Sequence, residues 1–133
     1  MLLDLHIAGK PIPWKRTNVY KGRRLTPADV RAAEKAIGLL AASQTTGGPA
    51  LGPLALGIEF RMPTHDGRGR LGEPGEWCAH TPDLDNLIKL VGDGLNGVAF
   101  KDDRQIVELW ARKVFHSEPA TVVRLGRPAN ASA

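Results

Sequence analysis

An alternating run of apolar residues from Leu54 to Met62 is the strongest constraint on the fold of this chain. Leucine, isoleucine, phenylalanine and methionine occupy every second position of the run. Side chains of a β-strand point alternately to opposite faces of the sheet, so this pattern predicts a strand with one buried face. Burying that face requires other elements to pack against it.

Two elements are expected before this strand. Residues 3–7 alternate between apolar and polar side chains, which predicts an opening strand. The alanine-rich segment 28–43 follows Thr26-Pro27, a typical N-cap and first-turn pair, and is predicted to be a helix. Glycine and proline then mark 45–53 as a connection.

Three elements are expected after it. Residues 63–76 hold four glycines and two prolines and are predicted to form a mobile loop. Apolar residues spaced by three, four and seven predict a helix from about 86 to 95. Two further apolar runs, 106–115 and 121–125, predict strands that we expect to pair as a hairpin.

The predicted order is strand, helix, strand, helix, strand, strand, which indicates an α+β protein with helices packed against a small mixed sheet. A chain of 133 residues supports one core, so we expect one domain over 1–126 and a flexible tail over 127–133. The single cysteine and the absence of a long apolar stretch or a basic leader lead us to expect a cytoplasmic protein without membrane contact.

Two carboxylates, Asp83 and Asp85, stand directly before the second predicted helix. An extended segment points side chains at i and i+2 in the same direction, so we expect both carboxylates to face one site. Asp85 or Asn86 is expected to cap the helix. Lys89 then lies one turn after Asp85, which places a cation beside the carboxylates.

A second acidic pair, Asp102 and Asp103, follows this helix and precedes the next strand. Taken alone, an aspartate before a helix is better explained by capping than by metal binding. Four carboxylates at the ends of adjacent elements would repel one another without a cation, so together they favour a site for Mg²⁺ or Mn²⁺. Asp93 either supports Lys89 or is a solvated helix residue.

The segment 9–26 contains six lysines and arginines and no acidic residue, and the whole chain has a formal charge of +4. Such a run is either a solvated surface or a nucleic-acid contact, and the aromatic residues within it favour nucleic acid. Trp77 and Trp110 are instead expected in the core or at an interface. The side chains predicted to contact DNA are Lys10, Trp14, Lys15, Arg16, Lys21, Arg23, Arg24, Arg68, Arg70 and Arg104.

The segment from Pro82 to Val107 resembles the RusA-type Holliday junction resolvases of bacteria and their phages. The resemblance is looser over the rest of the chain and extends to about Leu125. The motifs that carry it are Asp83-x-Asp85-Asn86-x-x-Lys89, Asp93-Gly94-Leu95-Asn96 and Asp102-Asp103-x-Gln105-Ile106-Val107.

The resemblance implies a homodimer that cuts four-way DNA junctions by paired, symmetrical phosphodiester hydrolysis in recombination and repair. It also implies that Asp83, Asp85 and Asp103 bind Mg²⁺ or Mn²⁺ and that Lys89 is essential for catalysis. Asp102 is the alternative to Asp103, because the spacing of this pair from the helix varies within the family. Two other functions stay open: a metal-dependent nuclease for other branched or single-stranded DNA, and a DNA-binding module without catalysis.

Overall fold

The computed structural model describes residues 1–14, 18–20, 23–25 and 28–130. The predicted Thr26-Pro27 cap lies outside the described residues. The elements are β1 (Leu3–Ala8), β2 (Asn18–Tyr20), β3 (Arg23–Leu25), α1 (Ala28–Gln44), β4 (Leu54–Pro63), β5 (His65–Asp66), β6 (Gly69–Arg70), α2 (Leu84–Leu95), the 3₁₀ helix η1 (Asp103–Gln105), β7 (Ile106–His116) and β8 (Ala120–Gly126).

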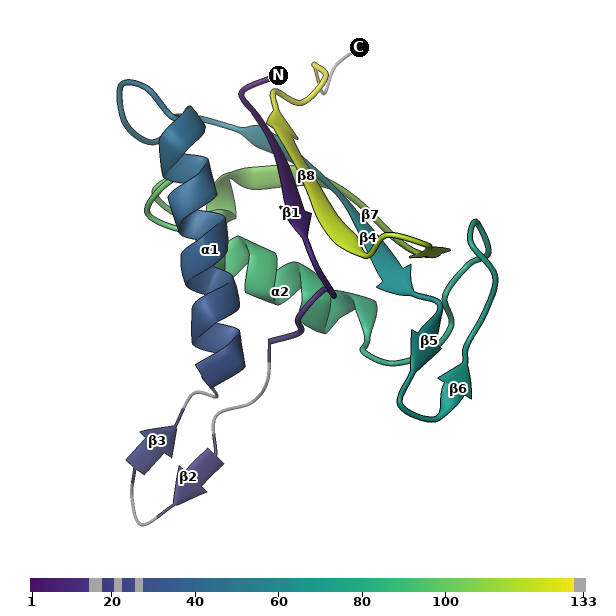
Figure 1. Cartoon of the computed structure of the whole chain (residues 1–133). Helices are drawn as coiled ribbons and strands as arrows, with labels where there is room; N and C mark the ends of the chain where they lie inside the picture. The colour runs from purple at the N-terminus through teal and green to yellow at the C-terminus, as the bar shows by residue number, and fades with distance from the viewer. Residues whose placement is uncertain (15–17, 21–22, 26–27, 131–133) are drawn as a thin grey trace.

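The main sheet has four strands in the order β1-β8-β4-β7, with β4 antiparallel to β8 and parallel to β7. Both helices cover the same face of this sheet (Figure 1). The alternating residues of β4 are all buried, at 0–4% exposure, and contribute to a single core with side chains of α1 and α2. The predicted α+β fold and the predicted strand with one buried face are therefore confirmed.

Two segments for which no strand was predicted contain short hairpins. β2 pairs with β3 inside the basic segment, and β5 pairs with β6 inside 63–76. Each hairpin is a separate two-stranded sheet, apart from the four-stranded one. Strands of two or three residues are too short to show a clear alternation, which explains why the sequence pattern missed them.

The predicted hairpin of the last two strands is wrong, because β4 lies between β7 and β8. In the observed register, Pro63 lies opposite His116 and Arg61 lies opposite Ala120. The short link between β7 and β8 therefore passes the end of β4. β4 is therefore hydrogen-bonded along both of its edges, to β7 on one side and to β8 on the other.

α1 and α2 approach closely at a pair of glycines. A Cβ atom on Gly94 would lie 2.9 Å from the Cβ of Ile37 and 3.1 Å from the carbonyl oxygen of Glu34. A Cβ on Gly38 would lie 3.2 Å from the carbonyl oxygen of Gly94. Because any larger residue would push the helices apart, this contact sets the position of α2 on the sheet. The apolar face of α2 is buried through Leu87, Leu90, Val91 and Leu95.

In the described part of the chain, no helix is both long and apolar enough to cross a membrane. The boundary predicted at residue 127 stays a prediction. Arg127 itself is attached to the fold, because its guanidinium donates to the carbonyl oxygens of Leu51 and Pro53.

Candidate functional site

Asp83 and Asp85 lie at the N-terminal end of α2, and both are exposed. Asp83 is the N-cap residue, with the extended backbone typical of that position (φ −66°, ψ 143°), but its side chain makes no capping hydrogen bond. The predicted cap at Asp85 or Asn86 is therefore wrong, and Asp85 lies in the first helical turn. The positive end of the helix dipole favours carboxylates here.

The loop that leads to Asp83 is fastened to β7 by one lysine that the sequence analysis missed. The ammonium of Lys113 donates to the carbonyl oxygens of His80 at 2.6 Å and of Pro82 at 2.7 Å. The backbone N–H of Cys78 donates to the carbonyl oxygen of Lys113 at 3.1 Å. Lys113 faces the same side of the sheet as its parallel neighbour Phe60, and a cation at such a position needs polar partners. This requirement becomes visible only once β7 is paired with β4.

Lys89 lies one turn after Asp85, as predicted, and its ammonium is 4.9 Å from the centroid of the Trp14 ring. The backbone N–H of Trp14 donates to the carbonyl oxygen of Asn86 at 2.9 Å. Trp14, predicted to stack on bases, is thus held against α2 by a hydrogen bond and a cation–π contact.

Glu34 of α1 is a second residue that the sequence analysis missed. Burial raises its pKa, nearby Asp93 raises it further, and nearby Lys89 lowers it. Both predicted roles of Asp93, a support for Lys89 or a solvated helix residue, stay predictions. The proximity of Glu34 to Asp93 is visible only in the folded structure, because the two residues are about sixty positions apart in sequence.

Asp102 is the N-cap residue of η1, and its side chain makes a capping hydrogen bond. Its carboxylate accepts from the backbone N–H of Arg104 at 3.0 Å, and the amide oxygen of Gln105 accepts from the N–H of Asp102 at 3.2 Å. The hydrogen bond from the backbone N–H of Arg104 is the main cause that lowers the pKa of Asp102. Because capping engages Asp102, exposed Asp103 is the better metal-ligand candidate of the two.

The two acidic pairs lie at opposite ends of α2. The helix has 12 residues, so its ends are about 18 Å apart. β7 gives a consistent separation, because Pro82 is bonded to Lys113 whereas Asp103 lies next to Ile106, about 23 Å back along the strand.

Within one chain, therefore, the predicted carboxylates do not meet. No group of three or more histidine, cysteine, aspartate or glutamate residues in the described ranges is close enough to hold a metal ion. The expectation that one chain would bring all four together is wrong. The donor type still fits, because exposed carboxylate oxygens are the ligands that Mg²⁺ takes in proteins. The assignment of Asp83, Asp85 and Asp103 as ligands stays a prediction.

Of the cations predicted to contact DNA, those whose side chains the structure describes lie at both ends of α2. Lys10 shares a cavity of about 330 Å³ with Asp66 and Pro82, so the start of the basic segment and the β5–β6 hairpin flank the Asp83 end (Figure 1). Arg68 and Arg70 belong to this hairpin, and Arg70 is paired with Glu73. Arg104 lies at the other end, 4.0 Å from Asp102.

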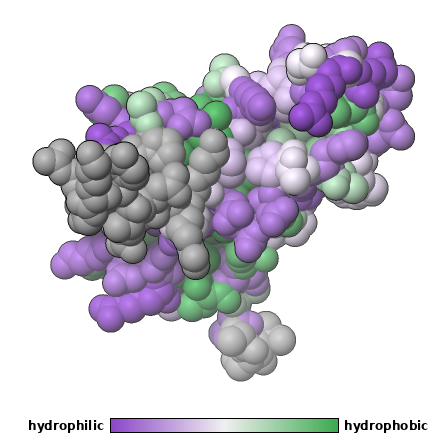
Figure 2. Space-filling view, turned by 90° about the horizontal axis from the view of Figure 1, so that it is seen from below, coloured by the Kyte–Doolittle hydropathy of each residue, from purple (hydrophilic) through white to green (hydrophobic). Residues whose placement is uncertain are grey.

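The structure describes less of the remaining residues that were predicted to contact DNA. Seen from below, the molecule is mainly hydrophilic, with scattered apolar areas (Figure 2). Lys15, Arg16 and Lys21 lie outside the described residues. For Arg23 and Arg24 only the strand to which they belong, β3, is described.

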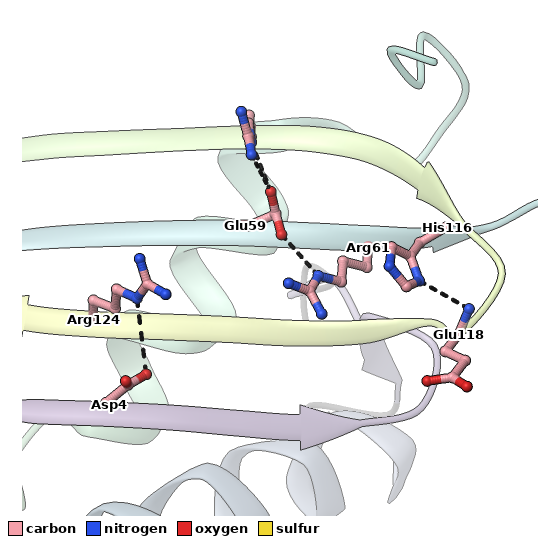
Figure 3. Close-up of polar contacts among 7 residues, drawn as sticks. Asp4, Glu59, Arg61, His116, Glu118 and Arg124 are labelled. Carbon is pink, nitrogen blue, oxygen red and sulfur yellow. Dashed lines mark hydrogen bonds and ion pairs between the residues drawn. The ribbon is translucent and has the colours of Figure 1, made fainter. Parts of the chain in front are cut away.

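The sheet face away from the helices carries ion pairs rather than a carboxylate cluster (Figure 3). Glu59 accepts from the guanidinium of Arg61 at 2.7 Å and from that of Arg112 at 2.8 Å. The hydrogen bond from Arg61 is the largest cause of the lowered pKa of Glu59. Arg124 lies 3.9 Å from Asp4 on the neighbouring strands. This face therefore offers little free carboxylate for a metal.

β7 forms one edge of the sheet and exposes apolar side chains. Val107 is 63% exposed, Leu109 50% and Trp110 54%, and nearby Trp77 is 70% exposed. Both tryptophans were predicted in the core or at an interface, and these exposures exclude the core. Residues 75–78 hydrogen-bond to β7 at 113 and 115, so they cover only its last part.

Comparison with known proteins identifies a family and a relative. The family profile described as endodeoxyribonuclease RusA matches residues 8–126. An uncharacterized protein of Bacillus subtilis (strain 168), YqaN, is 43% identical over 44 residues. That match covers 33% of this chain and 31% of the relative, so the chain spans about a third of the curated relative that it matches.

Proposed function

Because the chain belongs to the RusA endodeoxyribonuclease family, we propose that it is a Mg²⁺-dependent endonuclease that resolves four-way DNA junctions by paired, symmetrical cuts. The observation that best supports this is the exposed pair Asp83 and Asp85 at the start of α2, with Lys89 one turn further along. Mn²⁺ is the alternative ion, because it takes the same oxygen ligands.

In this proposal Asp83, Asp85 and Asp103 hold the cation. When bound, the ion lowers the pKa of a water ligand and offsets the charge that develops on the phosphate. Lys89 places an ammonium beside the same phosphate and stabilises the charge from the protein side. Lys10 and Arg68, exposed near the Asp83 end, contact neighbouring phosphates and hold the DNA in place.

Asp103 is too far from Asp83 to join it within one chain, so we propose that each site takes Asp103 from a second copy of the chain. A homodimer then contains two equivalent sites, each made by both protomers. Two equivalent sites suit a substrate that must be nicked on two opposing strands.

The free edge of β7 is a suitable surface for this dimer. An exposed edge strand with apolar side chains pairs readily with another strand, and Val107 and Leu109 are uncovered there. If two copies of β7 pair antiparallel about a two-fold axis near Leu109, the start of one strand lies beside the end of the other. Asp103 of the partner subunit is then brought toward the loop that Lys113 fastens, next to Asp83.

Mixing two inactive variants tests this arrangement. Asp85→Asn and Asp103→Asn are each expected to abolish cleavage of a labelled four-way junction with Mg²⁺. In a mixed dimer, a shared site leaves one site with both wild-type residues, so mixing restores cleavage. If each site belongs to one chain, every site in the mixture carries one substitution, and cleavage stays absent.

A matching linear duplex and EDTA complete the assay. Paired nicks in the junction alone, abolished by EDTA, would support resolution. Equal cutting of the duplex would instead indicate a nuclease of broader preference.

One observation favours a second candidate, a DNA-binding module without catalysis. The described residues of one chain hold no ready group of three metal ligands. Such a module would bind the junction equally in Mg²⁺ and in EDTA and would not cut it under either condition. Metal-dependent cutting excludes it.

A further inference from the structure

Lys89 lies between carboxylates on both sides along α2. Asp85 lies one turn before it and Asp93 one turn after it. Glu34 from α1 lies near both Asp93 and Lys89, as the opposite effects of these two residues on the pKa of Glu34 indicate. The lysine side chain is long and flexible, so its ammonium can move toward either end.

Trp14 contacts Lys89 from outside the two helices. The ring is partly buried against the core, and its backbone is bonded to Asn86, in the turn that carries Asp85. The ammonium lies 4.9 Å from the ring centroid, within the range of a cation–π contact. Among the described residues, Lys89 makes no ion pair within 4.0 Å, so the ring is its nearest identified partner.

We propose that Trp14 is a positioning residue that keeps the Lys89 ammonium at the Asp85 end of α2 and away from Glu34 and Asp93. This inference rests on the proposed function, because it assigns Trp14 a role in placing the lysine beside the scissile phosphate. A cation–π contact and an exposed ion pair are similar in strength, so removing the ring shifts Lys89 toward the acidic pair. The ring face that Lys89 covers is then not available for stacking on a base.

Substitutions at Trp14 and Glu34 test the proposal together. Trp14→Leu is expected to slow single-turnover cleavage of a four-way junction about fivefold, with the junction Kd unchanged. Trp14→Phe keeps a weaker aromatic face, so its cleavage rate is expected to lie between those of the wild type and Trp14→Leu. Glu34→Gln, added to Trp14→Leu, removes part of the competing charge and restores part of the rate. Glu118→Gln, which removes a carboxylate outside both helices, restores none.

A readout without DNA separates this inference from the nuclease proposal. In lysine-labelled protein, the Lys89 Cε signals, identified by their loss in Lys89→Arg, should show an upfield ring-current shift that disappears in Trp14→Leu. Circular dichroism checks that the variants are folded. If the wild type cuts no DNA, the proposed function fails while the shift still reports the lysine position. A wild-type shift near zero overturns the inference, as does a Trp14→Leu protein that binds the junction weakly but cuts at the normal rate.

Discussion

Replacing Gly94 by alanine should destabilise the protein, although alanine is the better helix former. The added Cβ would meet the Cβ of Ile37 at 2.9 Å and the backbone oxygen of Glu34 at 3.1 Å, and a backbone atom cannot move aside cheaply. Overpacking of this kind costs about 1–3 kcal/mol. The gain in helix propensity offsets about 1 kcal/mol, so the net loss in the free energy of unfolding is about 0–2 kcal/mol.

Gly92→Ala is the matched control, because it lies in the same helix and no atom lies within 4 Å of its added Cβ. It should gain about 0.5–1 kcal/mol from propensity alone. Urea unfolding at 25 °C measures both variants, with unchanged m values as a check on two-state behaviour. The reasoning predicts that Gly94→Ala is less stable than Gly92→Ala by about 1–3 kcal/mol. Equal stabilities would show that the helices separate freely and that Gly94 does not set the position of α2.

Three further changes have defined outcomes. Asp85→Asn should abolish junction cleavage and leave the junction Kd nearly unchanged, because it removes one ligand charge and little volume; joint loss of binding and cleavage would count against its role. Hydrogen bonds from Arg61 and Arg112 lower the pKa of Glu59, so it stabilises the folded state above the unfolded-state pKa and loses that contribution as pH falls through its lowered folded-state pKa. Denaturant titrations should show Glu59→Gln less stable than wild type at pH 7, with the difference shrinking below about pH 4. Leu109→Glu should convert the proposed dimer to monomer in sedimentation velocity, whereas Leu39→Glu, at an exposed position of α1, should not; a stable Leu109→Glu dimer would exclude the β7 edge.

Local patterns predicted the main elements but not their pairing. The alternation over β4 identified a strand with one buried face, and the burial of every second residue from Leu54 to Met62 confirms that interpretation. The same kind of pattern cannot say which strands are neighbours, and it placed β7 beside β8 where the structure inserts β4. Only the register, with Pro63 opposite His116, explains how three linking residues pass the end of the central strand.

The sequence predicted the individual residues of the candidate site better than their arrangement in space. Asp83, Asp85 and Asn86 are all residues that favour an N-cap, so composition alone could not tell which one begins α2. The separation of Asp103 was within reach of the sequence, because a helix from 86 to 95 already spans about 15 Å. The contacts of Glu34 and Lys113 could not be predicted from the sequence, because each depends on two elements that are distant in the chain.

The position of the acidic residues at opposite ends of α2 has a consequence for how activity would depend on assembly. If each site needs Asp83 and Asp85 from one copy and Asp103 from another, a monomer contains two incomplete sites and cuts nothing. One two-fold contact completes both sites at once, because an isologous interface makes every contact twice. Under the proposed assembly, cutting activity and two-fold symmetry therefore arise together, so single nicks by a half-assembled enzyme are avoided. The exposed apolar edge of β7, which would be an aggregation hazard in a monomer, then has a structural reason to be exposed.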